Sequence, residues 1–280
     1  MKSIFLNLLM LCIISHGFAQ NLICSPQDRE AFNTKIKTIS NIKTEDIGTT
    51  MVAVGKTFIG IPYVAKTLEI GETESLVINF QGLDCTTFVE NVLAFSIMVQ
   101  NNEKDFDNFI GHLETIRYKD GELNGYASRL HYFSEWIANN EHKGLLKDMT
   151  SQIGGVESNK AINFMSSHRE LYPFLKDADN YKKIQASEEF LKSKSICILP
   201  QDQIKANEHL IRSGDIIALT TSINGLDITH TGIASRETDG RIHLLHASTG
   251  SMEVEVSKIP LAEYLKGIKS NTGIMVARPL

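Results

Sequence analysis

Cys85 lies in the stretch Asp84-Cys85-Thr86-Thr87, at a position where a buried helix is expected to begin. Gly82 ends the extended run before it, Asp84 is a residue type that favours the helix N-cap, and residues 88–99 are apolar nearly all round. The free N–H groups and the macrodipole at a helix N-terminus stabilise a thiolate, which is the reactive form of cysteine. Cys85 is therefore a candidate nucleophile.

Two histidines far along the chain supply a candidate base and a partner for it. The turns at Asn224-Gly225 and Asp239-Gly240 delimit two short strands, which carry His230 and His246. Period-two alternation places His230 on the same face as Gly232, where small side chains leave room for another element to approach. The two strands are therefore expected to be neighbours with one histidine each.

Packing of the cysteine helix on the face of Gly232 and Ala234 would bring the thiol to the base. His230 would then contact the sulfur of Cys85, and His246 would hold the other ring nitrogen of His230. The alternative for an isolated cysteine at a helix start is a small buried residue of the core. The two predicted strands that carry His230 and His246 favour a catalytic arrangement of nucleophile, base and orienting group over a buried structural cysteine.

The blocks that carry this chemistry occur in the order of a known family. They are Asp84-Cys85-Thr86, Ser213-Gly214-Asp215-Ile216, His230-Thr231-Gly232-Ile233 and His246-Ala247-Ser248, preceded by Gly60-Ile61-Pro62-Tyr63. Their order resembles that of the NlpC-type cysteine peptidases of bacterial cell-wall metabolism, which have a papain-like fold. Longer blocks resemble the branch of N-acetylmuramoyl-L-alanine amidase-like proteins, namely residues 62–69, 84–90 and 128–133. The similarity covers most of the chain after about residue 50.

The resemblance implies an α+β fold with a papain-like, NlpC-type core, in which a buried N-terminal cysteine helix packs on a C-terminal antiparallel β-sheet. It implies Cys85 as nucleophile, His230 as base and His246 as the orienting third member. It also places Tyr63 beside the nucleophile, where the hydroxyl would help the cysteine N–H to stabilise the oxyanion, a contact worth about 3 kcal/mol in other enzymes. The chain departs from the superfamily pattern at Thr86-Thr87, where a Ser-Gly pair is commoner.

The region between the cysteine helix and the histidine strands, about residues 101–205, is expected to be a mostly helical insertion that shapes the cleft. Residues 128–138 have helical spacing and combine basic and aromatic side chains, a mixture that can stack on a sugar ring and bind its polar groups. Arg129 and His131 are better candidates for ligand contact than Trp136, whose size suits the core. The candidate substrate-binding residues are Asp84, Thr86, Ser128, Arg129, His131 and Trp136.

The resemblance implies an exported cysteine amidase that hydrolyses the N-acetylmuramoyl-L-alanine bond of peptidoglycan fragments, including anhydromuropeptides, through a thioester. Two alternatives stay open. One is a γ-D-glutamyl-diamino acid endopeptidase of the same superfamily, and the other is a non-catalytic muropeptide-binding protein, in which Cys85 would show no selective reactivity. No cofactor is expected, and no metal, because zinc needs convergent ligands and His243 points to the face opposite His246.

The composition agrees with one catalytic domain. The chain has 280 residues, 42 % hydrophobic and 22 % charged, which can bury one large core, and no repeat argues for more. We therefore expect a single papain-like domain over residues 20–280 that is monomeric. The net charge of −5 without Lys/Arg-rich clusters argues against nucleic acid as a partner. The expected partners are muropeptides.

The N-terminus predicts export. Met1-Lys2, the apolar residues 4–14 and the small residues that follow have the charge, length and spacing of a secretory signal peptide cleaved after Ala19. The apolar segment is too short to span a membrane. Lipid attachment at Cys24 is the alternative, but Ile23 stands where a lipidation signal needs a small residue. The expected location is the periplasm or the cell envelope.

Three cysteines remain after the predicted cleavage, namely Cys24, Cys85 and Cys197. An odd number in an exported chain leaves at least one thiol unpaired within the chain, which suits a catalytic thiol. Cys24 and Cys197 could form a disulfide or both be free.

Overall fold

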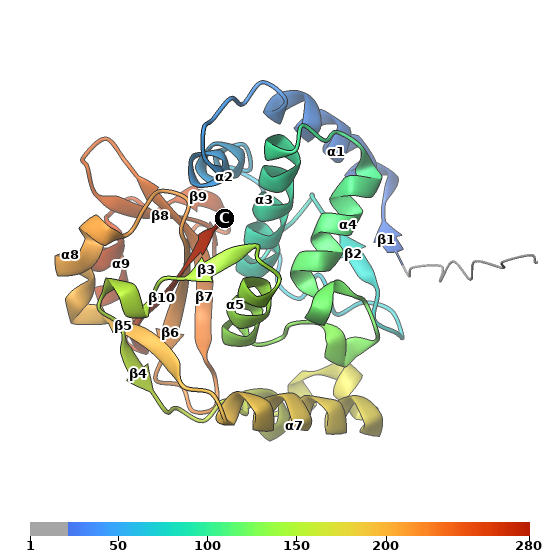
Figure 1. Cartoon of the computed structure of the whole chain (residues 1–280). Helices are drawn as coiled ribbons and strands as arrows, with labels where there is room; N and C mark the ends of the chain where they lie inside the picture. Colours follow the sequence, from blue (N-terminus) through green and yellow to red (C-terminus); the bar gives the residue numbers. More distant parts are fainter. Residues whose placement is uncertain (1–21) are drawn as a thin grey trace, which may run out of the picture.

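The computed structural model describes residues 22–280 and has helices on both faces of an antiparallel sheet (Figure 1). The predicted signal peptide, residues 1–19, lies outside the described residues. The helices are α1 (Pro26–Ile39), α2 (Ile47–Lys56), α3 (Cys85–Gln100), α4 (Phe106–Arg117), α5 (Phe133–His142), α6 (Phe164–Ser167), α7 (Ala178–Lys192), α8 (Ile204–Asn207) and α9 (Leu261–Lys266). Within residues 22–280, none of these helices combines the length and apolarity needed to cross a membrane.

The main sheet has the strand order β4-β5-β10-β6-β7-β8-β9, with β3 pairing alongside β10. All its pairings are antiparallel, whereas β1 and β2 form a separate parallel pair. The strands are β1 (Leu22–Cys24), β2 (Leu76–Ile78), β3 (Leu146–Asp148), β4 (Val156–Ser158), β5 (Ile196–Pro200), β6 (Ile216–Thr221), β7 (Ile228–Arg236), β8 (Ile242–Ser248), β9 (Glu253–Val256) and β10 (Asn271–Pro279). The predicted α+β class with an antiparallel C-terminal sheet is confirmed.

Helix α3 begins at Cys85, as predicted, because a capping box closes its first turn. The carboxylate of Asp84 accepts a hydrogen bond from the N–H of Thr87 at 2.8 Å, and the Thr87 hydroxyl accepts one from the N–H of Asp84 at 2.9 Å. The helix body is buried, and its apolar side chains form the centre of the largest core cluster. The second threonine of the motif therefore fixes the turn that carries the thiol.

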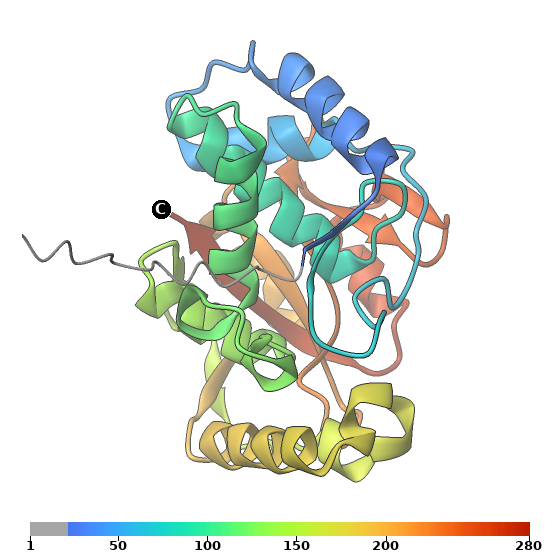
Figure 2. The same ribbon diagram turned by 90° about the vertical axis from the view of Figure 1, so that its right-hand side faces the viewer.

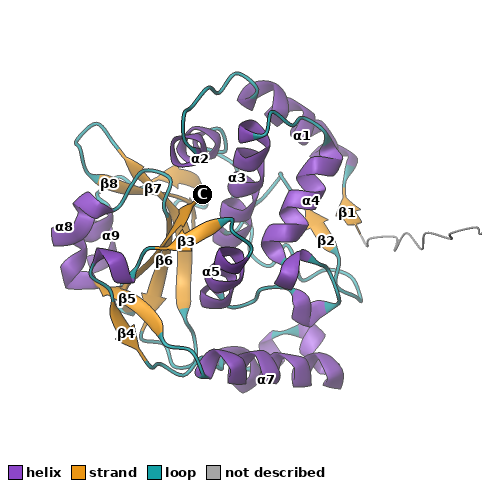
Figure 3. Cartoon of the chain, in the orientation of Figure 1, coloured by secondary structure: helices purple, strands orange, loops and turns teal. Residues whose placement is uncertain are grey.

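Helix α3 packs on the sheet face that carries Ile233, Leu245 and Ala247. The expectation that it packs on the face of Gly232 is wrong. A Cβ on Gly232 would lie 2.9 Å from the Cβ of His246, so the small residue makes room for the neighbouring strand rather than for a helix. That opposite face is covered instead by α9, and Figure 3 shows the sheet between α8 and α9 on one side and α2, α3 and α5 on the other.

Residues 101–205 contain the helices α4 to α7, but β3, β4 and β5 from the same region also extend the main sheet. The predicted helix over residues 128–138 begins only at Phe133. Before it the chain is extended, because the N–H of Leu130 donates to the carbonyl of Arg117 at 3.0 Å rather than to a helical neighbour. Helix α7 lies across one end of the molecule, at the bottom of Figures 1 and 2.

Candidate active site

Cys85 is half-buried at the point where the N-terminus of α3 meets β7. The backbone of Thr231 forms a hydrogen bond with its sulfur, and so do the hydroxyl and the backbone of Thr86. Thr231 directly follows His230 in the chain. The thiol therefore reaches the strand that carries the predicted base, at the residue next to that base.

The two predicted histidines are in direct contact. Nε2 of His230 lies 2.6 Å from Nδ1 of His246, and the two rings are nearly perpendicular, at 87°. His230 is 9 % exposed and His246 is completely buried. The contact uses Nε2 of His230, so Nδ1 is the ring nitrogen of His230 that does not face His246.

The protonation pattern of this pair follows from the chemistry of a base at Nδ1. If His230 accepts a proton at Nδ1, its own hydrogen is on Nε2. The Nε2–H then donates a hydrogen bond to Nδ1 of His246. His246 must then be protonated on Nε2, which is buried and has no hydrogen-bond partner within residues 22–280. The ring of Tyr264 on α9 lies edge to face with His246, with 5.5 Å between centroids. The pair is thus enclosed by packing, which fixes the ring orientation.

Burial raises the pKa of the Cys85 thiol to about 12, and the charge of Asp84 adds to the rise. Hydrogen bonds at the helix N-terminus act in the lowering direction but are the weaker effect. Burial also lowers the pKa of His230 to about 4. The lowering effect predicted for the helix N-terminus is thus present, but burial outweighs it. At pH 7 the Cys85 thiol and the His230 imidazole are each neutral.

We expect the alkylation of Cys85 by iodoacetamide to accelerate about tenfold for each pH unit from pH 6 to pH 9, because the thiolate fraction grows in that proportion below the pKa. The alkylation rate is measured by intact-protein mass spectrometry of samples in which the reaction has been quenched at successive times. A rate that is already constant above pH 6 would contradict the neutral pair and would indicate a preformed thiolate and imidazolium.

Tyr63 is fixed beside the thiol by the backbone on both sides. Its N–H donates to the carbonyl of Met252 at 2.8 Å, and it forms a β-bridge with Leu83. Burial raises the pKa of its hydroxyl to about 12, and the neighbouring Cys85 and Asp84 raise it further. The hydroxyl therefore remains protonated at neutral pH and is able to donate a hydrogen bond near the sulfur.

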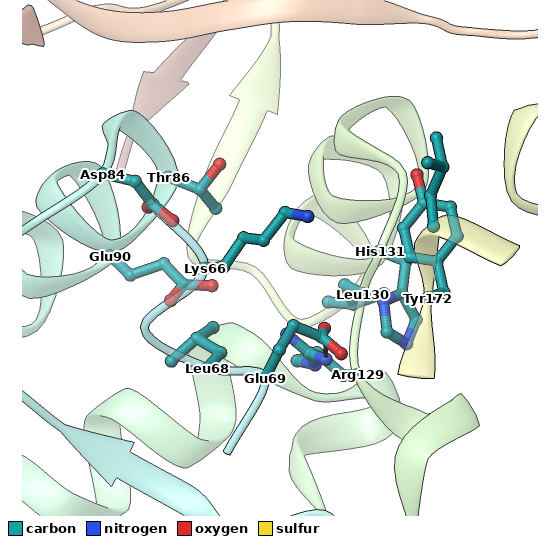
Figure 4. A pocket seen from close by; sticks show the side chains of 11 residues that line it. Lys66, Leu68, Glu69, Asp84, Thr86, Glu90, Arg129, Leu130, His131 and Tyr172 are labelled. Atoms are coloured by element: carbon teal, nitrogen blue, oxygen red, sulfur yellow. Dashed lines mark hydrogen bonds and ion pairs between the residues drawn. The ribbon is translucent and has the colours of Figure 1, made fainter. Parts of the chain in front are cut away.

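A cleft of about 220 Å³ begins beside the thiol (Figure 4). Asp84 and Thr86, the neighbours of Cys85 in the chain, form one end of it, and His131 and Tyr172 lie at the other. Its charged and polar lining consists of Lys66, Glu69, Asp84, Thr86, Glu90, Arg129, His131 and Tyr172.

The structure brings most of the predicted substrate-binding residues to this cleft, but not all of them. Asp84, Thr86, Arg129 and His131 line it. Ser128 instead lines a separate hollow beside α7, and its hydroxyl donates to the carbonyl of Gly125 at 2.8 Å. Trp136 is completely buried and stacks on Phe133, with 4.7 Å between ring centroids. The predictions for Ser128 and Trp136 are therefore wrong, because residues 128–138 do not form one helix facing the cleft.

Arg129 lines the cleft, but its guanidinium is held by ion pairs within the protein. Its guanidinium forms an ion pair with Glu69, and its Nε lies 3.1 Å from a carboxylate oxygen of Glu74. His131 is held likewise, by a hydrogen bond of 2.8 Å between Nε2 and the carbonyl of Tyr126. These two side chains build the wall of the cleft, and the ligand contact predicted for them stays a prediction.

Sequence reasoning missed Lys66, Glu69 and Glu90 as lining residues. Lys66 and Glu69 lie in one of the blocks that carried the family resemblance, which was the only signal for them. Glu90 lies one helical turn or more after Cys85, on the side of α3 that faces the cleft. Its ion pair with Arg117, at 2.7 Å, is long-range and leaves no pattern in the sequence.

Replacement of His246 by alanine is expected to lower turnover about 10²- to 10⁴-fold, less than loss of the nucleophile, because orientation of His230 is lost but proton transfer is not. His243→Ala is the matched control. His243 also lies on β8, but it bonds to the carbonyl of Ser257 and to Asp239 instead. Steady-state kinetics on folded variants make the comparison, and equal losses in the two variants would remove His246 from the site.

A family model and solved structures both relate the chain to N-acetylmuramoyl-L-alanine amidases. Residues 53–274 match the family model AmiA-like, described as N-acetylmuramoyl-L-alanine amidase-like. No curated protein matches the chain. The structure is similar to that of an N-acetylmuramoyl-L-alanine amidase from Bacteroides uniformis, with a TM-score of 0.80 and 40 % identity, over 84 % of this chain and 99 % of that chain.

Two further solved structures are similar. One is a Bacteroides fragilis protein described as a candidate xylanase, with a TM-score of 0.76 and 43 % identity over 80 % of this chain and 98 % of that chain. The other is a Legionella pneumophila protein, which shares the fold at a TM-score of 0.70 with 21 % identity, over 90 % of this chain and 95 % of that chain. The chain belongs to the N-acetylmuramoyl-L-alanine amidase-like family.

Proposed function

We propose that the chain is a cysteine amidase of papain-like, NlpC-type architecture that cleaves the bond between the N-acetylmuramoyl lactyl group and L-alanine in peptidoglycan fragments. The observation that carries this proposal is the approach of Cys85, at the N-terminus of α3, to the backbone of Thr231, the residue next to His230. Cys85 contacts the backbone next to His230, which is bonded to His246 at 2.6 Å. Membership of the amidase-like family agrees with an amide as the substrate.

In the proposed reaction, the sulfur of Cys85 attacks the lactyl carbonyl carbon while its proton moves to Nδ1 of His230. The C–N bond then breaks, and His230 gives the proton to the departing amine of L-alanine. Water hydrolyses the resulting thioester, with the same histidine as base. His230 accepts the proton in its uncharged form, which is the form present at pH 7.

The developing oxyanion needs hydrogen-bond donors. We assign this role to the hydroxyl of Tyr63 together with the N–H of Cys85. The raised pKa of Tyr63 keeps its proton available over the neutral range. Loss of one such donor costs about 3 kcal/mol in transition-state stabilisation in other hydrolases.

The test is mass spectrometry of the products formed from a defined disaccharide tetrapeptide, in normal and anhydro forms. The mature protein and its Cys85→Ala variant are incubated in parallel. Release of free disaccharide and of a peptide that begins with L-alanine, by the unsubstituted protein alone, is the expected result. A sugar that keeps a dipeptide would indicate the γ-D-glutamyl endopeptidase instead, and binding without cleavage would indicate a muropeptide-binding protein.

Hydrolysis of xylan has less support from this site. Glycoside hydrolysis normally uses two carboxyl groups on either side of the scissile bond. In the cleft, Glu69 is paired with Arg129 and Glu90 with Arg117, while Asp84 caps α3. These carboxylates are therefore occupied by structural contacts. Incubation with xylan in the same experiment, with release of reducing sugars as the readout, is expected to give no product.

Export completes the proposal. We infer that residues 1–19 direct the chain out of the cytoplasm to the compartment that contains peptidoglycan, on the strength of their signal-like sequence. Expression of the full chain followed by fractionation and N-terminal sequencing is expected to yield a periplasmic or envelope form that begins at Gln20. A form that still begins at Met1 would contradict it.

A further inference from the structure

The charged side chains that line the cleft can be sorted by whether another group of the protein satisfies them. Glu69 is paired with Arg129, and Glu90 with Arg117. Asp84 accepts from the backbone and hydroxyl of Thr87 at the start of α3. Each of these charges therefore has a structural counterpart, which lowers its availability to a ligand.

Lys66 is different. Its ammonium has no hydrogen bond or ion pair to any other residue between 22 and 280. Figure 4 shows its side chain reaching into the cleft between the wall that carries Thr86 and the wall that carries His131. Lys66 is thus the one lining charge in the described part of the chain that is left unpaired.

The backbone of Lys66 has φ of 61°, in the left-handed region. A residue with a Cβ adopts this conformation at a cost of about 1–2 kcal/mol, which glycine avoids. The segment is nevertheless fixed, because the N–H of Glu69 donates to the carbonyl of Lys66 at 3.2 Å and Glu69 is tied to Arg129. The fold therefore holds a lysine in an unfavourable backbone conformation at the mouth of the cleft, as functional sites often do.

We propose that Lys66 binds a carboxylate of the substrate and so determines which end of the muropeptide enters the cleft. This inference rests on the proposed amidase function. The lactyl carboxyl group of the sugar is consumed in the scissile amide, so the sugar side offers no carboxylate near the bond. The nearest one belongs to the second residue of the stem peptide, a γ-linked D-glutamate, roughly 7 Å along an extended chain. The cleft therefore receives the peptide.

The stem peptide occurs with this carboxylate free or amidated, which provides a direct test. We expect the enzyme to prefer the D-glutamate form over the D-isoglutamine form by about ten- to hundredfold in kcat/KM, the range for a hydrogen bond to a charged group. Lys66→Gln should cleave both forms at the slow rate of the amidated one. Lys66→Arg should keep part of the preference. Lys183→Gln, an exposed lysine beside the separate hollow at α7, should behave as the unsubstituted protein.

Measurement of kcat/KM for both peptide forms, with the unsubstituted protein and with Lys66→Gln, isolates the interaction between Lys66 and the D-glutamate carboxylate. A preference that survives in Lys66→Gln, or equal cleavage of both substrates by the unsubstituted protein, would overturn the role of Lys66 while leaving the amidase function intact. If neither substrate is cleaved, the amidase proposal fails. Calorimetric binding of both peptides to Cys85→Ala then decides the subsite separately, because tighter binding of the free carboxylate supports it and equal or absent binding overturns it.

Discussion

Cys85→Ala is expected to abolish turnover of muropeptides, by about 10⁴- to 10⁶-fold, with the fold intact. Alanine has no group that can form the thioester, and the half-buried side chain it replaces is small. His230→Ala is expected to reach a similar loss, since the two residues act in the same proton transfer and losses within such a unit are not additive. Rates of disaccharide release, with thermal unfolding in parallel, measure both effects.

Cys197→Ala is the matched control for this experiment. Cys197 is also a half-buried free thiol, but it lies on β5 and pairs across the sheet with Glu157. Its replacement should leave turnover unchanged. Comparable activity in Cys85→Ala and the unsubstituted protein would exclude a thioester route, whereas loss of activity in Cys197→Ala alone would point to a different thiol.

Arg129→Met is expected to lower the free energy of unfolding by about 3–5 kcal/mol, which corresponds to a decrease in Tm of roughly 10 °C. The substitution leaves Glu69 and Glu74 without their guanidinium, and Glu74 is almost completely buried. Tyr118 also donates to Glu74, at 2.9 Å, so the unpaired charge cannot simply turn to water. Denaturant titration of the purified variant measures the loss.

Lys192→Met is the control for Arg129→Met. Lys192 pairs with Glu189 at 3.5 Å, but both side chains are exposed, so the expected change is within about 0.5 kcal/mol. Partial recovery in the double variant Arg129→Met with Glu74→Gln would support the unpaired carboxylate as the cause. If Arg129→Met unfolded normally but lost affinity for muropeptides, Arg129 would be a ligand-binding residue after all.

The sequence by itself determined the elements that carry the chemistry. The cap at Asp84 and the apolar run after Cys85 are local signals, and they define α3 wherever the helix packs. The turns and the alternation around His230 and His246 likewise define β7 and β8, which are neighbours as expected. Local hydrogen bonding and side-chain periodicity depend on residues that are close together in the chain. These elements could therefore be predicted from the sequence.

The tertiary structure decided which partners the side chains found. Gly232 appeared to offer a face to a helix, yet it accommodates His246 of the next strand. Arg129 and Trp136 looked similar as candidates for ligand contact, yet one holds two carboxylates at the cleft wall and the other lies in the core. Partners such as Glu69 and Glu74 lie some sixty residues away in the chain, and no local pattern records them.

The protonation state of the site was also decided only by the fold. A helix N-terminus lowers the pKa of a thiol, and this effect is visible in the sequence. Burial raises it, depends on every element packed around Cys85, and is the larger effect here. Desolvation is a property of the assembled environment rather than of residues adjacent in sequence. The sequence therefore determined that Cys85 begins a helix, as the candidate nucleophile, and the tertiary structure determined the charge of its thiol.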